Sequence, residues 1–213
     1  MTMPVSKEVA STSVDRATFQ NLYAGKAPWD IGKPQAAFVA VADRVTGPIL
    51  DAGCGTGEHA LFFAARGHRV IGIDFVEEAI RRARAKAAER GLSVEFLVKD
   101  ATTLGNWGKR FASVIDSGLF HVFSDADRLR YVAGLAKVLQ PGGRLFLMCF
   151  SDEEPGTEGP RRVSRQELDA AFADGWEVES VQPVQIEINP EFTEVQFSEG
   201  GPKAWFAVVR RMG

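Results

Sequence analysis

Cysteine is scarce in this sequence: Cys54 and Cys149 are the only two among 213 residues. Because they lie far apart in the chain, they form neither the closely spaced ligand set of a zinc site nor a framework of several disulfides. Free cysteine is among the residue types most often buried. We therefore expect two buried free thiols and no metal site.

Long apolar runs and an excess of one charge are also lacking. No segment is apolar over the roughly 20 residues needed to span a bilayer, and residues 1–18 lack the apolar core of a signal peptide. The formal net charge is only -3, so there is no general attraction for phosphates or anionic lipid. We expect a cytoplasmic protein of a single domain, without a nucleic-acid or membrane partner.

What the sequence does contain is a regular alternation of short apolar runs and helical patterns from residue 48 onward. Such alternation is typical of βαβ units and a parallel sheet. The predicted strands cover residues 48–51, 69–74, 93–98, 113–116 and 144–150. The predicted helices cover residues 58–65, 77–90 and 125–139.

The pattern changes in the last fifty residues or so. Ser164 and Glu167 fit a capping box that opens a short helix to about residue 173. Residues 176–188 and 204–210 then read as two strands separated only by a loop, so they should pair antiparallel. A parallel sheet that ends in an antiparallel hairpin is less usual for a dinucleotide-binding domain.

The most informative stretch is a glycine turn, Asp51-Ala52-Gly53-Cys54-Gly55-Thr56-Gly57, between an apolar strand and a helical pattern. A turn of this kind lies at the C-terminal edge of an open α/β sheet, where ligands bind. Glycine there allows positive φ and a close approach of the backbone to a ligand. The residues around the turn decide which ligand it is.

Three ligands compete for such a turn: a nucleoside triphosphate, a dinucleotide and S-adenosylmethionine. A phosphate loop closes in Lys-Ser or Lys-Thr, but Gly57 is followed by Glu58 and His59. A dinucleotide site needs a small residue at position 58, where the Glu58 carboxylate would repel pyrophosphate at the helix N-terminus. S-adenosylmethionine carries an ammonium and a sulfonium, so it prefers acidic surroundings, and Asp51 would anchor its amino-acid end.

Two further carboxylates follow the second and third strands. Asp74 can accept hydrogen bonds from both ribose hydroxyls, although an acid at this place also occurs in NAD-binding folds. Asp100, followed by Ala101, can accept a hydrogen bond from the adenine amine while a backbone amide meets the ring. The alternative is that Asp100 caps a turn or a helix.

With these motifs, residues 48–150 resemble a class I S-adenosylmethionine-dependent methyltransferase, whose first motif matches the glycine turn. The resemblance implies an α/β, Rossmann-like, seven-stranded and mostly parallel sheet with helices on both faces. Its last strand, residues 204–210, should insert antiparallel between the fifth and the sixth. The implied cofactor is S-adenosyl-L-methionine, with contacts from Gly53, Gly55, Asp74, Phe75, Asp100 and Ala101.

The segment before the first strand carries a second resemblance. Its Pro28-Trp29-Asp30-x-Gly32-x-Pro34 pattern is similar to the entry segment of thiopurine, thiol and halide methyltransferases and of tellurite-resistance proteins. In those families the segment covers the cofactor and helps to build the acceptor pocket, which implies that Tyr23 and Trp29 contact both cofactor and substrate. The alternative packs these aromatics into ordinary core. The longer loops of thiopurine enzymes are absent, so the substrate stays open.

The segment after the fourth strand, residues 116–121, should lie beside the reacting methyl group. Methyl transfer is an in-line displacement that depends mainly on alignment and on exclusion of water. A general base helps only when the acceptor is neutral and has a high pKa. His121 is the candidate base, but it can equally bond the backbone or shape the pocket; Asp116 should face the cofactor or order the loop.

Two late loops, residues 151–163 and 189–202, reach the same edge of the sheet by topology. Phe192 and Phe197 are candidates for the wall of an apolar acceptor site, although alternation in a hairpin explains them equally well. Arg161 and Arg162 either receive an anionic acceptor or remain solvated.

The sequence therefore predicts one methyltransferase domain, residues 1–213, with a helical lid (1–45), a cofactor-binding core (46–150) and an acceptor-side region (151–213). We expect methyl transfer to a sulfur, oxygen or nitrogen atom of a small aromatic or heterocyclic molecule, by a monomer or weak homodimer. Without a basic patch or an Asn-Pro-Pro-Tyr motif, nucleic-acid or protein methylation is a weaker alternative. A non-catalytic cofactor-binding module and a dinucleotide-dependent oxidoreductase stay open.

Overall fold

The structure is a computed structural model that describes residues 13–14, 16–25 and 27–213. Its strands are β1 (Ile49–Ala52), β2 (Val70–Asp74), β3 (Glu95–Val98), β4 (Phe111–Ser117), β5 (Leu139–Phe150), β6 (Trp176–Gln185) and β7 (Lys203–Arg211). Its α-helices are α1 (Arg16–Ala24), α2 (Ala36–Ala40), α3 (Glu58–Ala65), α4 (Glu77–Glu89), α5 (Asp125–Val138) and α6 (Arg165–Ala171). Short 3-10 helices are η1 (Ala42–Arg44), η2 (Ala101–Asn106) and η3 (Phe120–Val122).

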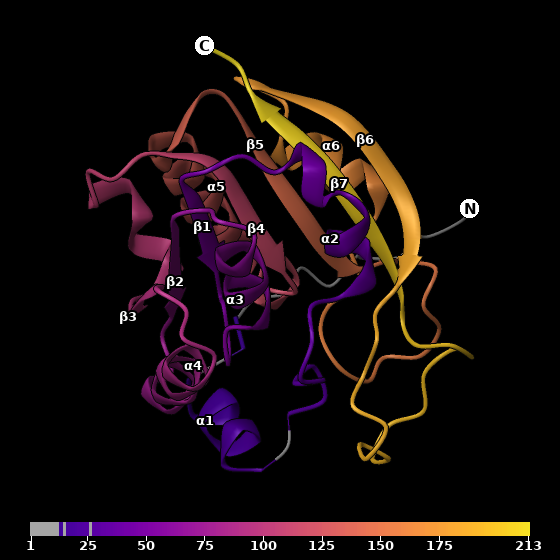
Figure 1. Cartoon of the computed structure of the whole chain (residues 1–213). Helices are drawn as coiled ribbons and strands as arrows, with labels where there is room; N and C mark the ends of the chain where they lie inside the picture. The colour runs from indigo at the N-terminus through magenta and orange to yellow at the C-terminus, as the bar shows by residue number, and fades with distance from the viewer. Residues whose placement is uncertain (1–12, 15, 26) are drawn as a thin grey trace, which may run out of the picture.

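All seven strands belong to one sheet, in the order β3-β2-β1-β4-β5-β7-β6 (Figure 1). Strand β7 runs antiparallel to both of its neighbours, β5 and β6, whereas every other neighbouring pair is parallel. This confirms the predicted fold, including the insertion of the last strand between the fifth and the sixth. Strand β5 begins earlier than predicted, because Leu139 pairs with Phe111 ahead of a shift in register.

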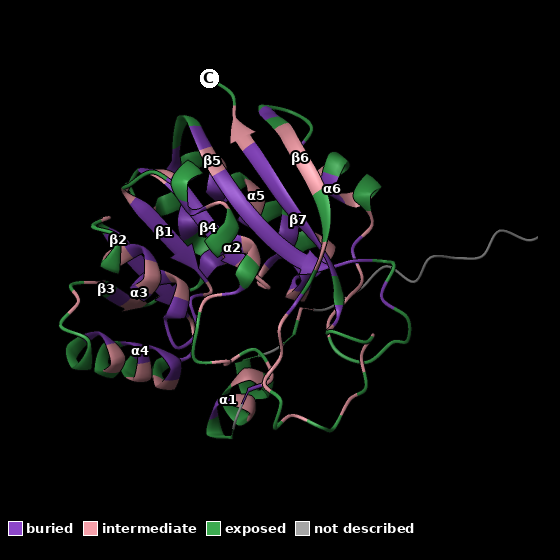
Figure 2. Cartoon of the chain, turned by 45° about the vertical axis from the view of Figure 1, so that its right-hand side comes forward, coloured by how far each residue is buried: buried purple, intermediate pink, exposed green. Residues whose placement is uncertain are grey.

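Hydrophobic side chains fill both faces of the sheet, as the burial of its central strands in Figure 2 shows. Along β1, Leu50 and Ala52 pack on the side of α5 and α6, whereas Ile49 packs on the side of α2, α3 and α4. Side chains alternate between the two faces of a strand, so every residue of β1 is buried, and its one polar side chain, Asp51, accepts a backbone amide. Cys54 and Cys149 are buried and free, as predicted.

Side-chain caps set where two of the helices begin. The Ser124 hydroxyl accepts a hydrogen bond from the Asp127 amide at the start of α5. At α6 the predicted capping box is present, since Ser164 and Glu167 bond each other's backbone amides. These caps fix the chain direction just after the loops that leave the C-terminal edge of the sheet.

The N-terminal segment, which we call the strap (the described residues from 13 to 35), crosses that edge. It begins at the start of α5, where the Val14 amide donates to the Val122 carbonyl at 3.0 Å. Its helix α1 lies beside α4 (Figure 1). It then reaches the end of β6, where the Asn189 amide donates to the Pro28 carbonyl at 2.7 Å. The strap therefore bridges three parts of the fold.

Helices α1, α2 and η1 all lie within the predicted helical lid, residues 1–45, of which residues 1–12, 15 and 26 fall outside the described residues. Within the described part of the chain, none of the helices has the length and apolar character needed to cross a bilayer.

A single buried hydrogen bond gives a test of the core: the Tyr131 hydroxyl donates to Asp116 Oδ2 at 2.9 Å. Tyr131→Phe leaves that oxygen without its donor, so we expect a loss of about 1–3 kcal/mol in unfolding free energy. For a domain of this size, each kcal/mol lowers the melting temperature by about 2–4 °C. The control is Leu129→Ala on the same helix, where the side chain is 72% exposed and little should change. Equal melting temperatures for Tyr131→Phe and the wild type would contradict this account.

Candidate functional site

The glycine turn after β1 presents bare backbone at the C-terminal edge of the sheet. Gly55 has φ 53°, and a Cβ there would lie 2.8 Å from the Tyr23 hydroxyl oxygen. Gly57 has φ 89°, and a Cβ there would lie 2.7 Å from the Phe96 ring. Both positions exclude a side chain by conformation and by space. The turn therefore needs glycine to fit between the sheet core and the strap.

Two buried carboxylates flank the turn. Asp51 Oδ2 accepts the Ala60 amide of α3 at 2.9 Å. Asp74 accepts the amides of Gly55 at 3.0 Å and of Val76 at 2.9 Å. Burial raises the pKa of Asp51 to about 7 and that of Asp74 to about 6. Neither takes part in any ion pair among the described residues, so this edge offers negative charge to a cation.

Asp116 follows the apolar part of β4, and both of its carboxylate oxygens accept hydrogen bonds from the protein. Oδ1 accepts the amides of Leu119 at 2.8 Å and Phe120 at 3.2 Å, and Oδ2 accepts the Tyr131 hydroxyl. Burial raises the pKa of Asp116 to about 6. These contacts support the loop-ordering role of Asp116 over its predicted contact with the cofactor.

On the side predicted for adenine, Asp100 is the N-cap of η2. Its Oδ1 accepts both the amide and the hydroxyl of Thr102 at 2.8 Å, so the capping alternative is present. The Asp100 side chain is exposed, which leaves Oδ2 accessible to an amine, and Ala101 beside it is buried. Phe75, after β2, packs edge-on against Phe19 of the strap, with ring centroids 5.5 Å apart.

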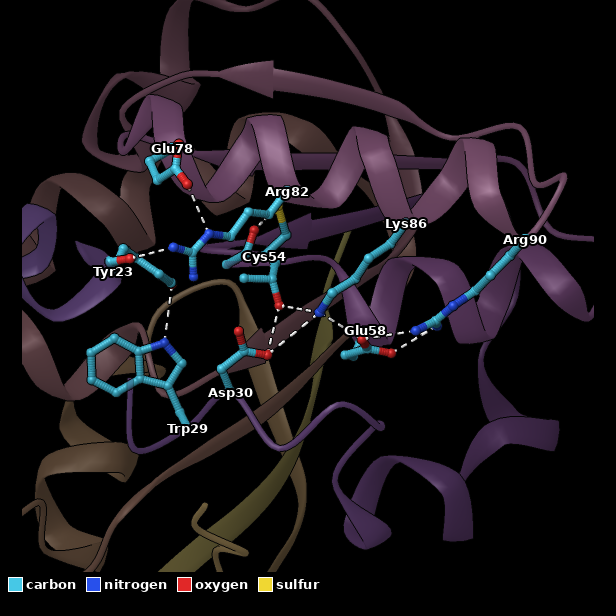
Figure 3. Close-up of polar contacts among 11 residues, drawn as sticks. Tyr23, Trp29, Asp30, Cys54, Glu58, Glu78, Arg82, Lys86 and Arg90 are labelled. Atoms are coloured by element: carbon cyan, nitrogen blue, oxygen red, sulfur yellow. Dashed lines mark hydrogen bonds and ion pairs between the residues drawn. The ribbon is translucent and has the colours of Figure 1, made fainter. Parts of the chain in front are cut away.

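The strap brings Tyr23 and Trp29 to the glycine turn (Figure 3). The Trp29 Nε1 donates to the Tyr23 hydroxyl at 3.0 Å, and the hydroxyl lies directly over Gly55. Burial raises the pKa of Tyr23 well above its ordinary value, so this phenol stays protonated. Tyr23 is buried like a core residue, whereas Trp29 is 36% exposed. Both are placed to cover a ligand in the turn.

A polar network from α4 holds the strap down (Figure 3). Lys86 Nζ donates to the Thr56 hydroxyl and to Glu58 Oε1, each at 2.8 Å, and Thr56 donates to Asp30 Oδ1 at 2.8 Å. Arg90 adds a second cation to Glu58 at 2.8 Å. Lys86 thus links the turn to the strap.

This network corrects one inference from the sequence. We expected Glu58 to place an unbalanced negative charge at the start of α3, but Lys86 and Arg90 neutralise it. The argument against a dinucleotide that rested on Glu58 is therefore wrong. Lys86 was missed altogether. The signal was the spacing of Arg82, Lys86 and Arg90, which puts three cations on one face of a helix.

His121 lies in η3, at the end of β4 and β5. Its Nδ1 accepts the Phe150 amide at 2.9 Å, which assigns the ring proton to Nε2. Burial, with the charges of Arg128 and Arg162, lowers the pKa of His121 to about 3. Because the lone pair of this neutral ring is already used, His121 is better suited to donate from Nε2 than to remove a proton. The geometry thus favours the backbone-bonding alternative over the predicted general base.

Around His121 there is an aromatic wall. The His121 and Phe150 rings are 5.2 Å apart, and Phe197 from the loop between β6 and β7 packs edge-on against Phe150 at 5.7 Å. Phe192, in the same loop, is half-buried in a turn closed by its amide and the Asn189 carbonyl. The structure therefore brings Phe197 to Phe150, which packs against His121, while it shows no ring contact for Phe192 among the described residues.

The two arginines of the loop after β5 are used inside the protein. Arg161 pairs with Asp125 and Glu167. The Arg162 guanidinium lies 5.1 Å over the Phe150 ring and donates to four carbonyls of its own loop. Neither is a solvated charge, and neither is free to receive an anionic acceptor.

The two late loops and the strap are tied together at this edge. Buried Glu154 accepts the amides of Ser198 at 3.1 Å and Lys203 at 2.8 Å, which joins the loop after β5 to the loop before β7. The Gln35 side chain forms two hydrogen bonds, each 2.8 Å, with the backbone of Glu187 after β6. Residues far apart in sequence thus frame one site above the ends of β1, β4 and β5.

The fold and this site define a nucleoside-binding α/β protein whose ligand turn carries acidic residues. Comparison with known proteins makes the assignment specific. Residues 49–143 match a family model described as a methyltransferase domain. The 2-heptyl-1-hydroxyquinolin-4(1H)-one methyltransferase of Mycobacteroides abscessus is 34% identical over 196 residues, which is 86% of this chain and 85% of that protein.

Two further proteins agree with this match. A probable thiol methyltransferase 2 of Arabidopsis thaliana is 29% identical over 78% of this chain and 76% of that protein. The solved structure reported as "Conversion of a Disulfide Bond into a Thioacetal Group during Echinomycin Biosynthesis" has a TM-score of 0.80 and 35% identity, over 93% of both chains. The chain belongs to the class I S-adenosylmethionine-dependent methyltransferases. Its cofactor is S-adenosyl-L-methionine.

The residues at the turn fit this cofactor. The glycines of the turn add no side chain of their own that would block a nucleoside, and buried Asp51 and Asp74 form no ion pair among the described residues. Asp51 would accept the cofactor's ammonium, and Asp74 would accept hydrogen bonds from its ribose hydroxyls. When bound, S-adenosylmethionine supplies an electrophilic methyl group.

The raised carboxylate pKa values predict how cofactor binding depends on pH. Below about pH 6 to 7, Asp51 and Asp74 are protonated and neutral, whereas above it they are ionised and attract the cofactor. The Kd for S-adenosylmethionine should therefore fall as the pH rises from about 5 to about 8. Calorimetry near pH 6.5 in two buffers of different ionisation enthalpy should show proton release, and proton uptake or a constant Kd would contradict it.

Asp51→Asn provides the matched control. Because burial raises the pKa of Asp51, ionising it destabilises the free protein most above about pH 7. The stability cost of the carboxylate grows as the pH rises from about 4 to about 7. The variant should therefore melt higher than the wild type by a larger margin at pH 8 than at pH 5, while it binds the cofactor more weakly at pH 8. A variant that melts lower at pH 8 would show that the carboxylate is needed for folding.

The strap network predicts a second effect. Lys86→Met removes the contacts with Thr56 and Asp30, so amide hydrogens of residues 27–31 should exchange faster. We expect cofactor affinity to fall about tenfold, which is about 1.4 kcal/mol. Arg90→Met is the control, because Arg90 contacts Glu58 without touching the strap. Equal exchange of residues 27–31 in the two variants would contradict the assignment.

Proposed function

We propose that this enzyme transfers the methyl group to a sulfur, oxygen or nitrogen atom of a small aromatic or heterocyclic molecule. The observation that carries the proposal is the aromatic wall of His121, Phe150 and Phe197 beside the glycine turn. An apolar wall of this kind suits a flat ring. The relatives support it, since one is named for a hydroxyquinolone and another for thiols.

In this proposal the chain acts by binding, orienting and excluding water. Gly53, Gly55 and Asp74 hold the nucleoside, and Asp100 with Ala101 and Phe75 flanks the adenine. Tyr23 and Trp29 close the turn from above, where the hydrogen bond between them keeps both rings in place. Phe197, with Phe192 nearer the loop tip, lines the acceptor side.

Alignment carries most of the catalysis under this proposal. Because His121 Nδ1 is occupied by the Phe150 amide, the histidine orients the acceptor from Nε2 instead of acting as its base. The strap and the late loops keep water from the reacting atoms, which strengthens every polar contact inside. A protein that only sensed the cofactor would need no aromatic wall on the acceptor side.

Transfer assays separate the enzyme from a cofactor-binding module. The protein is incubated with methyl-labelled S-adenosylmethionine and, in turn, 1-hydroxyquinolin-4(1H)-one, thiophenol, 4-nitrophenol and a pyridine-type heterocycle. We expect label on at least one acceptor. Tight cofactor binding without transfer to any of the four would favour the binding module.

Asp74→Ala serves as the control for the cofactor half of the site. The loss of the ribose contacts should weaken binding by about 1–3 kcal/mol, with transfer reduced at subsaturating cofactor. Unchanged affinity in this variant would place the ribose elsewhere.

A further inference from the structure

Arg128 on α5 is buried without enough hydrogen-bond partners. Its side chain is 7% exposed, and among the described residues neither Nε nor Nη2 has a partner. The remaining nitrogen, Nη1, lies 3.5 Å from Glu167 Oε1, at the outer limit of a hydrogen bond. An unsatisfied buried donor on a charged group is destabilising by several kcal/mol in general. Such donors indicate a ligand.

The nearby acids bind Arg161 more closely than Arg128. Asp125 and Glu167 both bind Arg161 closely, and Glu167 also closes the capping box of α6. Arg161 itself repels Arg128, which lowers the Arg128 pKa together with burial. The two acids and the two arginines cancel in formal charge, but of these two arginines Arg128 is the one without a close ion pair between α5, α6 and the loop after β5.

The Arg128 charge adjoins the acceptor side of the site. The Arg128 guanidinium lies 4.4 Å from the centroid of Phe120, the residue before His121. Its charge acts on His121 and also on Cys149 at the end of β5. The Arg162 guanidinium lies over the Phe150 ring, which itself packs against His121. Two cations therefore lie near a neutral histidine whose Nε2 carries a proton.

We propose that Arg128 and His121 Nε2 form an anion-binding subsite, and that the enzyme methylates acidic acceptors such as N-hydroxy heterocycles, phenols or thiols in their deprotonated form. This rests on the proposed function and narrows its substrate class. The guanidinium supplies charge and donors, and the imidazole supplies one further N–H. A cation at this place lowers the acceptor pKa, so no general base is required.

The step balances without a further reactant. The acceptor has already lost its proton to water, and its oxygen or sulfur forms the new bond to the methyl carbon. The bond from that carbon to the donor sulfur breaks, and its electron pair stays on the sulfur. One anion and one sulfonium cation thus give two products that carry neither charge.

The test uses 4-nitrophenol as a probe, because its ionised form absorbs visible light. The full chain is saturated with S-adenosylhomocysteine, and the absorbance of the bound probe is titrated with acid and base. We expect the bound probe's pKa to lie about 1–3 units below that of the free phenol, the effect of a nearby opposite charge. Arg128→Met should abolish the shift, whereas Arg128→Lys should keep part of it.

Arg130→Met is the matched control, since Arg130 lies on the same helix with its side chain 66% exposed. It should leave the probe's shift unchanged. The pH dependence of kcat gives a second measurement, because its midpoint reports the pKa of the bound acceptor. The midpoint should move upward in Arg128→Met and stay in Arg130→Met. Should Arg128→Met fail to fold, Arg128→Lys still decides, since a weaker shift is expected there.

The anion-binding subsite would be wrong if the wild type and Arg128→Met both bind the probe and the bound probe has the same pKa in each. Arg128 would then have only a structural role. A wild type that binds S-adenosylhomocysteine but not the probe would also overturn it. Failure of the proposed function looks different, because then no acceptor of any acidity is methylated.

Discussion

The structure depends on a pair of acidic side chains that are buried at the end of a parallel sheet and form no ion pair with any of the described residues. Asp51 and Asp74 are kept in place by backbone amides at the starts of α3 and α4. Burial raises the pKa of both, so their ionised forms are destabilising until a cation arrives. The free protein thus carries buried acidic groups at this edge, which a cationic ligand would stabilise in their ionised form.

The strap covers that site, and side chains of α4 hold the strap in place. Arg82, Lys86 and Arg90 stand four residues apart, so one face of the helix meets the Tyr23 carbonyl, the glycine turn and Glu58 in succession. The strap is also held where the Pro28 carbonyl meets the chain after β6. The strap therefore joins the loops on the cofactor side to the loops on the acceptor side. A movement of either set of loops would displace the other.

The sequence could predict what depends on periodicity and on strand ends. Alternating apolar runs predicted the sheet and its antiparallel last strand, and Asp51 and Asp74 were found because each lies at or next to the C-terminal end of a strand. What it could not predict are contacts between residues far apart in the chain. Lys86 meets Asp30 across 56 positions, and Arg128 reads as an ordinary charged helix residue until the fold buries it. The ring orientation of His121 depends on the Phe150 amide, which no local pattern reveals.

The two halves of the site carry opposite charge. Asp51 and Asp74 lie on the cofactor side, whereas Arg128 and Arg162 lie around His121 on the acceptor side. In a site of low dielectric constant such separated charges act strongly on what they face. If the acceptor is an anion, as we propose, it and the sulfonium are both attracted, and the protein aligns them between its own charges. Transfer removes both ligand charges at once, so each product loses the attraction that held its precursor. The same arrangement that gathers the reactants therefore favours release of the methylated product.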